Sequence, residues 1–126
     1  MKTDHPNAKM ARGAMEGGSP VGLADHLADD VVWHQVGEHE PLRGSQAVMD
    51  RFSDVAGLTF DFRLYDVVGD DDMVVVYGRA HITAGDRSSE YDAVEIYRMR
   101  GGKIAERYAM VGDMEAMNSF WSSLQS

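Results

Sequence analysis

Apolar residues in the first half of the chain recur mainly at helical spacing. The pattern predicts helices over residues 8–16, 19–28 and 45–56, each with one apolar face. A β-branched and aromatic run over residues 31–36 lies between the second and third helices and predicts a strand. Glycines and capping residues mark the expected helix ends: Gly17, Gly18, Ser19, Pro20, Ser45 and Gly57. Three helices and one strand are therefore expected before the main sheet.

From residue 58 the spacing of apolar residues changes from that of a helix to that of a strand. Apolar and polar side chains alternate over residues 58–65, which predicts a strand with one apolar face. Turns rich in Gly and Asp then separate three more strands, over residues 73–83, 90–99 and 103–111. Asp113 can cap a final helix that carries Met114, Met117, Phe120 and Trp121. The sequence predicts an α+β fold with an antiparallel meander.

Composition narrows the function classes. The chain has 126 residues, of which 44% are hydrophobic and 26% charged, as expected for one globular domain without linkers or repeats. Its net charge of −9, without a cluster of basic and aromatic residues, argues against binding to nucleic acid or to anionic membranes. The absence of cysteine excludes disulfides and thiol chemistry. No signal peptide or membrane span is readable, so we expect a cytoplasmic protein.

Three stretches together carry a family resemblance: ADDVVWHQVG (residues 28–37), YDAVEIYRMRGGKIAERY (residues 91–108) and GDMEAMNSFW (residues 112–121). They resemble the nuclear transport factor 2-like superfamily, and within it the SnoaL-like proteins and ketosteroid isomerases. The resemblance covers nearly the whole chain and implies one SnoaL-like domain over residues 1–126. It implies a cone, in which a curved, mostly antiparallel sheet wraps around N-terminal helices as a cystatin-like α+β barrel and leaves an apolar cavity. The superfamily includes isomerases, polyketide cyclases, epoxide hydrolases, dehydratases and binding modules, so it predicts fold better than reaction.

Two residues are candidates for proton transfer by their family positions. His34 stands where the ketosteroid isomerase pattern has its proton-shuttling carboxylate, and a base there would face the cavity. Its ordinary pKa of about 6.5 suits proton transfer at neutral pH. The alternative is a histidine that only forms a hydrogen bond within a core strand. Asp113 matches the cavity-mouth acid of SnoaL-like cyclases, and its alternative role is the helix cap.

Glu95 lies within an apolar strand and is the third catalytic candidate. The resemblance places it where ketosteroid isomerases carry the acid that donates a hydrogen bond to the developing oxyanion, a role that needs a protonated carboxyl. The same alignment points Arg107 inward, and Glu106 and Tyr108 outward. A pair with Arg107 would ionise Glu95 and make it a base or a structural anchor. A solvent-facing or ion-paired Glu is the plain alternative.

The chain also departs from the family patterns. Ala11 or Arg12 stands where ketosteroid isomerases place their oxyanion tyrosine. The strand around residue 79 is similar to the Arg-x-Asp pattern of limonene-epoxide hydrolase, but His81 replaces the first Asp and Ala109 the second. The family alignment directs Arg79 and His81 into the cavity, whereas the binary pattern places them on a hydrated face. The predicted substrate-binding residues are Trp33, Tyr77, Arg79, His81, Tyr97 and Arg107.

The outer face of the predicted sheet is expected to be apolar. It would comprise Val74, Val76, Ile82, Val94, Ile96 and Tyr108. Such a patch is too large for a monomer and predicts a homodimer, which agrees with the way SnoaL-like relatives pair. The segment over residues 34–40 has zinc-ligand residue types without zinc-site spacing, so we expect no metal and no other cofactor.

These observations lead to one main hypothesis and two alternatives. The main hypothesis is a cofactor-independent enzyme that performs acid/base chemistry on a small apolar carbonyl compound, polyketide- or steroid-like. The reaction would be an isomerisation, an aldol-type cyclisation or a dehydration. The first alternative is a non-catalytic module of the same fold that binds a small ligand. The second is an epoxide hydrolase of the limonene-epoxide hydrolase type.

Overall fold

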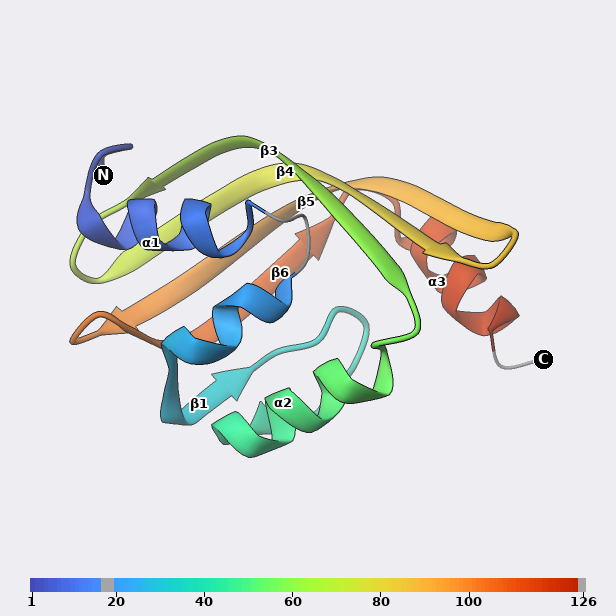
Figure 1. The fold of residues 1–126 in the computed structure, drawn as a ribbon, viewed down its shortest axis with the longest axis horizontal. Coiled ribbons are helices and arrows are strands. Elements are labelled where there is room, and N and C mark those ends of the chain that lie inside the picture. The colour runs from blue at the N-terminus through green and yellow to red at the C-terminus, as the bar shows by residue number, and fades with distance from the viewer. Residues whose placement is uncertain (17–19, 125–126) are drawn as a thin grey trace.

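The computed structural model describes residues 1–16 and 20–124, and contains one curved, unclosed sheet with helices along one side (Figure 1). The elements in chain order are α1 (Pro6–Ala14), the 3-10 helix η1 (Pro20–His26), β1 (Leu27–Trp33), β2 (Leu42–Arg43), α2 (Ser45–Asp54), β3 (Thr59–Gly69), β4 (Met73–Ala84), β5 (Arg87–Arg100), β6 (Lys103–Val111) and α3 (Met114–Ser123). The strand order is β2-β1-β6-β5-β4-β3. Strands β1 and β6 are parallel and the other neighbours antiparallel. The predicted α+β class and the cystatin-like architecture are confirmed.

The second predicted helix is the main error in the predicted elements. Only a 3-10 helix forms there, and residues 27–28, which were expected at the end of this helix, belong to β1 instead. Leu27 pairs with Ile104 of β6, so strand pairing outweighs the helical spacing of the apolar residues. The strand also ends at Trp33, before the predicted end at residue 36. The expected helix stop at Gly17–Gly18 and the cap at Ser19 lie outside the described residues.

The other predicted turns and caps follow the sequence with one exception. The Asp70 side chain accepts hydrogen bonds from the amides of Asp72 and Met73 and so forms the β3–β4 turn. Asp113 caps α3 by accepting from the amide of Ala116 at 2.9 Å. Ser45 does not cap α2, because the cap position is the preceding glycine and no side chain bonds there. The residue types at these positions therefore predicted the β3–β4 turn and the start of α3 correctly.

The register of β4 and β5 corrects the predicted outer face of the sheet. Val76 pairs with Glu95, so the two side chains share the face that the helices cover. Val74 and Ile82 lie on that face as well, and all three apolar residues are buried. The outer patch predicted with them is wrong at these positions. The apolar side chains on the outer face of β3–β6 include Tyr65, Tyr77, Val94, Ile96, Tyr108 and Met110.

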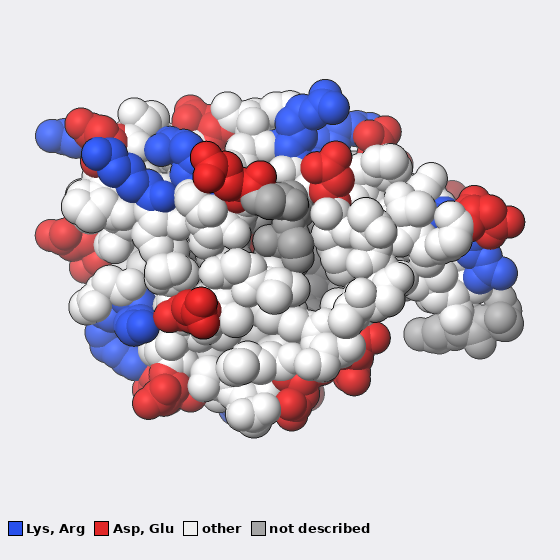
Figure 2. All heavy atoms as spheres, in the orientation of Figure 1, with Lys and Arg blue, Asp and Glu red and all other residues white. Residues whose placement is uncertain are grey.

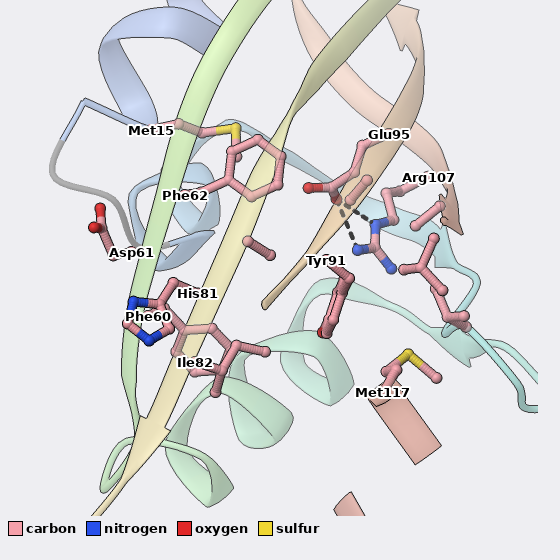
Figure 3. Close-up of a pocket in the computed structure, with 15 residues that line it drawn as sticks. Met15, Phe60, Asp61, Phe62, His81, Ile82, Tyr91, Glu95, Arg107 and Met117 are labelled. Carbon is pink, nitrogen blue, oxygen red and sulfur yellow. Dashed lines mark hydrogen bonds and ion pairs between the residues drawn. The ribbon is translucent and has the colours of Figure 1, made fainter. Parts of the chain in front are cut away.

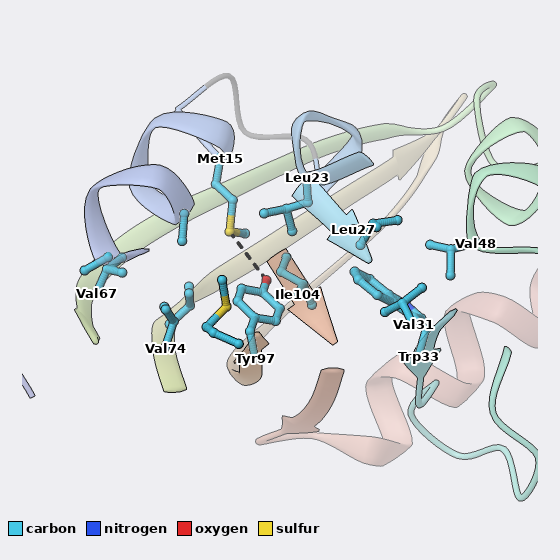
Figure 4. Close-up of a cluster of buried hydrophobic side chains, with 14 residues drawn as sticks. Met15, Leu23, Leu27, Val31, Trp33, Val48, Val67, Val74, Tyr97 and Ile104 are labelled. Carbon is cyan, nitrogen blue, oxygen red and sulfur yellow. Dashed lines mark hydrogen bonds between the residues drawn. The ribbon is translucent and has the colours of Figure 1, made fainter. Parts of the chain in front are cut away.

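Two clusters of buried side chains fill the covered face. The larger cluster lies beneath α1 and η1 and includes Met15, Leu23, Val31, Trp33, Val74, Tyr97 and Ile104 (Figure 4). Within it the hydroxyl of Tyr97 donates to the sulfur of Met15 at 3.8 Å. The smaller cluster lies under α3 and comprises Ile82, Tyr91, Met117 and Phe120. Members of both clusters line one pocket, which places the pocket where the two clusters meet.

Replacement of Gly78 by alanine tests the close packing of β3 on β4. A Cβ at this buried position would overlap the Arg63 carbonyl and the Phe62 ring. We expect Gly78→Ala to lower the free energy of unfolding by about 1–3 kcal/mol, because overpacking forces strands or side chains apart. Gly57→Ala is the control, since its Cβ would meet nothing within 4 Å. Urea denaturation measures both, and equal stability of the two variants would contradict this packing.

Candidate functional site

A pocket of about 130 Å³ opens on the covered face of β3, β4, β5 and β6 (Figure 3). Its lining is mostly apolar and aromatic: Met15, Val36, Phe60, Asp61, Phe62, Ala80, His81, Ile82, Tyr91, Ala93, Glu95, Arg107, Ala109, Val111 and Met117. Apolar pockets with a few convergent polar groups are the usual small-molecule sites of proteins. Glu95 and Arg107 direct charged groups into this cavity, whereas Figure 3 shows the carboxylate of Asp61, which also belongs to the lining, turned away from it.

Glu95 and Arg107 form a buried ion pair at one end of the cavity. The Nε and Nη2 atoms of Arg107 both lie 2.7 Å from Oε1 of Glu95, and Nη1 donates to the carbonyl of His34 at 2.7 Å. Only 7% of the Glu95 side chain and 15% of the Arg107 side chain are exposed. The guanidinium also lies 4.6 Å from the centre of the Trp33 ring. Arg107 is thus held on several sides in one orientation.

Strand register explains why these two side chains meet. On β6, Arg107 is opposite Tyr97 of β5, and Glu95 is opposite Ala109. Glu95 and Arg107 are therefore diagonal neighbours on the same face, within reach of long side chains. On the other side of β6, Trp33 of the parallel strand β1 pairs with Arg107. The predicted inward direction of Arg107, and the outward direction of its two neighbours on β6, are confirmed.

The ion pair determines how Glu95 can act. A guanidinium in direct contact favours the ionised carboxylate, which accepts protons and hydrogen bonds but donates none. Both contacts from Arg107 fall on the same carboxylate oxygen, and Figure 3 shows the second oxygen turned toward Phe62 across the cavity. Glu95 therefore presents a proton acceptor to the cavity, rather than the hydrogen-bond donor that the ketosteroid isomerase pattern implied.

Two tyrosines near the ion pair are kept neutral by their surroundings. Burial is the main cause that raises the pKa of the Tyr91 phenol above its ordinary value. Burial, followed by the charge of Glu95, raises the pKa of Tyr97 well above its ordinary value. Tyr91 contributes its ring to the pocket wall, whereas Tyr97 is fully buried in the larger cluster. Both phenols are therefore disfavoured as proton acceptors beside the Glu95 carboxylate.

His34 does not face the cavity. Because Trp33 and Arg107 share the covered face, the next residue along the chain turns to the opposite face. There Nε2 of His34 lies 2.8 Å from Oε2 of Glu106, and its ring stacks on Tyr108 with centroids 4.4 Å apart. The hydrogen bond from His34 is the main cause that lowers the pKa of the Glu106 carboxyl. The prediction that His34 faces the cavity as a base is therefore wrong, because its ring lies on the outer face of the sheet.

The remaining predicted site residues are divided between the outer face and the core. Tyr77 packs edge-on against Tyr65, and Arg79 pairs with Asp92 at 3.1 Å on the outer face. Main-chain alternation puts Ala80 and Ile82 toward the cavity, and Figure 3 shows the His81 imidazole turned away from it. For Tyr77 and Arg79 the binary pattern was right and the family alignment was wrong, whereas His81 belongs to the pocket lining without directing its imidazole into the cavity. Trp33 and Tyr97 lie in the core beneath the pocket, and Asp113 is an exposed helix cap.

Sequence reasoning missed most of the pocket wall. Phe60 and Phe62 were expected on an apolar strand face, but not as part of a site. Tyr91 and Ala93 share the face of Glu95 by simple alternation along β5, which was a usable signal. Ala109 was noted only as a missing carboxylate. Its small side chain, directly opposite Glu95, leaves the space that the pocket occupies.

The described residues show neither a group of metal-ligating side chains nor a helix that could span a membrane. Across residues 1–16 and 20–124, no three His, Asp or Glu side chains are grouped so that they could hold a metal ion. The helices in these ranges are all too short or too polar to cross a membrane. On the face shown in Figure 2, Lys and Arg are interspersed with Asp and Glu and do not gather in one basic patch.

Removal of Arg107 tests the strength of the buried ion pair. We expect Arg107→Met to lower the free energy of unfolding by about 3–5 kcal/mol, because it leaves a buried carboxylate without its partner. The double variant Glu95→Leu/Arg107→Met should recover most of this loss, since no charge is then buried. Arg98→Met is the control: its side chain is 60% exposed and pairs with Glu106 at 3.9 Å, so a change of about 0–1 kcal/mol is expected. Similar losses in the single and double variants would contradict a stabilising pair.

Comparison with known proteins agrees with this architecture. The family model of the SnoaL-like domain matches residues 8–107. A protein of unknown function with a cystatin-like fold from Xanthomonas campestris is 26% identical, with a TM-score of 0.78 over 96% of this chain and 98% of that one.

Two further solved structures are similar in fold at lower identity. A putative SnoaL-like polyketide cyclase from Shewanella denitrificans is 15% identical, with a TM-score of 0.73 over 93% of this chain and 97% of that chain. An LEH-like epoxide hydrolase from M. tuberculosis is 14% identical, with a TM-score of 0.72 over 94% and 90%. No curated protein matches the sequence. The family match covers most of the chain and the fold agrees with it, so the chain belongs to the SnoaL-like domain family.

Proposed function

We propose that the pocket binds a small, largely apolar carbonyl compound and that Glu95 removes a proton from the carbon next to the carbonyl. The observation that carries this proposal is a buried carboxylate, held by Arg107, with one oxygen turned into an apolar cavity. The reaction class is cofactor-independent acid/base chemistry: isomerisation, aldol-type cyclisation or dehydration. Glu95 takes the proton-transfer role that the sequence pattern had suggested for His34.

The first chemical step follows from the groups at the end of the cavity. A Glu95 oxygen takes the proton, the electron pair of the broken C–H bond forms a C=C bond, and the carbonyl oxygen gains the negative charge. A guanidinium has five N–H groups, and the contacts to Glu95 and His34 engage three of them. The others can donate to the developing oxyanion. Return of the proton to another carbon would complete an isomerisation.

The apolar walls favour this chemistry. Phe60, Phe62 and Ile82 exclude water from the carboxylate, so that its interaction with a bound substrate is stronger than in water. The fixed orientation of Arg107 means that little reorganisation is needed when charge develops on the substrate. One similar structure is described as a putative SnoaL-like polyketide cyclase, a description that fits this class of reaction.

The two alternatives predict different behaviour of the same pocket. In a binding module, the ion pair would be a structural anchor and the ligand would leave unchanged. An epoxide hydrolase of the limonene-epoxide hydrolase type needs a carboxylate that orients water and an acid that protonates the epoxide. Arg79 and His81, the residues that resembled that pattern, direct their side chains to the outer face. The geometry therefore favours carbonyl chemistry over epoxide hydrolysis.

Exchange of substrate hydrogen for deuterium tests the proposed role of Glu95 without knowledge of the natural substrate. We expect the protein to accelerate exchange of the C–H groups beside the carbonyl of cyclohexanone in D₂O, measured by proton NMR. Glu95→Gln keeps the shape of the side chain but cannot take the proton, so its rate should fall by at least about 100-fold. Glu90→Gln, on the outer face of the same strand, is the control and should retain the full rate.

Two other results of the exchange experiment would contradict the proposed reaction. Equal rates for Glu95→Gln and the unmodified protein would show that Glu95 is not the base. Binding of cyclohexanone without accelerated exchange in the unmodified protein would favour the binding module.

We also propose that the protein is a homodimer that pairs through the outer face of β3–β6. This face exposes large apolar side chains, including 54% of Met110, 50% of Tyr65 and 43% of Tyr77. Val94 and Ile96 extend the patch across β5.

The cytoplasmic location expected from the sequence stays a prediction.

A charge introduced into this patch tests the dimer. We expect the unmodified protein to be a dimer at micromolar concentration, and Met110→Glu to be a monomer, because the glutamate would have to be buried in the interface. Met49→Glu is the matched control, since Met49 is 45% exposed on α2, away from the patch. Light scattering distinguishes the two states, and an unmodified protein that is a monomer would contradict the proposal.

A further inference from the structure

We infer that the pocket selects neutral molecules of about the size of one six-membered ring, and that Ala109 and Ala93 on its floor and Met117 on its wall determine this size. The inference rests on the proposed function only in so far as the pocket is taken to be the binding site. It adds a substrate class that neither the family match nor the similar structures supply.

The volume of the cavity sets the first limit. At about 130 Å³ it is smaller than the range of roughly 300–1,000 Å³ that is usual for sites of drug-sized ligands. It is close to an apolar cavity of about 150 Å³ that is known to accept benzene. A single ring with one small substituent therefore fits, whereas a molecule of several fused rings has to displace part of the wall.

Small side chains on neighbouring strands form the floor of the cavity. Ala93 of β5 pairs with Val111 of β6, and Ala109 pairs with Glu95, so both methyl groups project from the sheet beside the carboxylate. Ala80 of β4 continues this floor. Because the floor is made of methyl groups on regular strands, a larger side chain there would occupy the space of the ligand. Met117 of α3, by contrast, contributes a flexible wall that substitution can remove.

The charges around the cavity set the second limit. Glu95 and Arg107 neutralise each other, and the Trp33 ring covers one side of the guanidinium. A carboxylate ligand would meet the Glu95 oxygen that is turned toward Phe62, and would be repelled by it (Figure 3). A neutral ligand with a hydroxyl group can donate to that oxygen instead. The favoured ligand is therefore neutral and carries one hydrogen-bond donor or an acidic C–H group.

Binding of four simple probes tests both limits. We would measure dissociation constants by calorimetry for phenol, benzene, benzoate and 2-naphthol. Phenol should bind at least tenfold more tightly than each of the others: benzene lacks the donor, benzoate carries the wrong charge, and 2-naphthol has a second ring.

Three variants test which residues set the size. Ala109→Leu should weaken phenol binding at least tenfold, because the added side chain fills the cavity. Ala105→Leu, on the same strand but outside the pocket lining, is the control and should leave phenol binding unchanged. Met117→Ala should reduce the preference for phenol over 2-naphthol at least tenfold, and it leaves the sheet intact if the Leu variant fails to fold.

The inference is overturned if 2-naphthol or benzoate binds as tightly as phenol, if Met117→Ala leaves the preference unchanged, or if no probe binds. These outcomes are separate from those of the exchange experiment. A size preference without catalysed exchange would contradict the proposed reaction but support the pocket limits. Exchange on a four-ring ketone as fast as on cyclohexanone would support the reaction but contradict the limits.

Discussion

Glu95 and Arg107 are opposite charges on the covered face of a sheet, where either charge alone would be destabilising by several kcal/mol. Their contact requires β5 and β6 to pair in one register, because a shift by a single residue would turn one of them to the outer face. It also requires β1 beside β6, since β1 supplies the Trp33 ring and the His34 carbonyl that complete the surroundings of Arg107. The antiparallel pairing of β5 with β6 and the parallel pairing of β1 with β6 therefore together determine the surroundings of this ion pair.

The pocket exists because the two apolar clusters of the covered face do not merge into one. Met15 marks the edge of the larger cluster and Met117 the edge of the smaller one, and both line the cavity between them. The alanines of β4, β5 and β6 leave this space unfilled on the sheet side. The two clusters stabilise the fold, and the pocket occupies the space between them. Substitutions in the pocket floor should therefore affect ligand binding more than folding.

Alternation of side chains predicted which residues of a strand share a face, because strand geometry leaves only two faces. It placed Glu95 on the same face as Tyr91 and Tyr97, and the family resemblance predicted the inward direction of Arg107 and the outward direction of Glu106, as the structure has them. The faces of β1 could not be predicted, since they depend on its register with β6, a strand distant in sequence. The antiparallel pairing of β4 with β5 was expected, but the face of β4 that the helices cover was not. For that reason His34 was expected in the cavity, and the valines of β4 were expected on the outside. The ion pair was one of several open alternatives until the register was known.

The protonation state of Glu95 is the quantity on which the account depends most directly. It can be measured by ¹³C NMR of glutamate labelled at the side-chain carboxyl, with the Glu95 signal assigned as the one that Glu95→Gln removes. At neutral pH the account predicts a carboxylate chemical shift, which moves when phenol is added. A signal characteristic of a protonated carboxyl at neutral pH would contradict it, because Glu95 would then be a donor and not the base of this pocket.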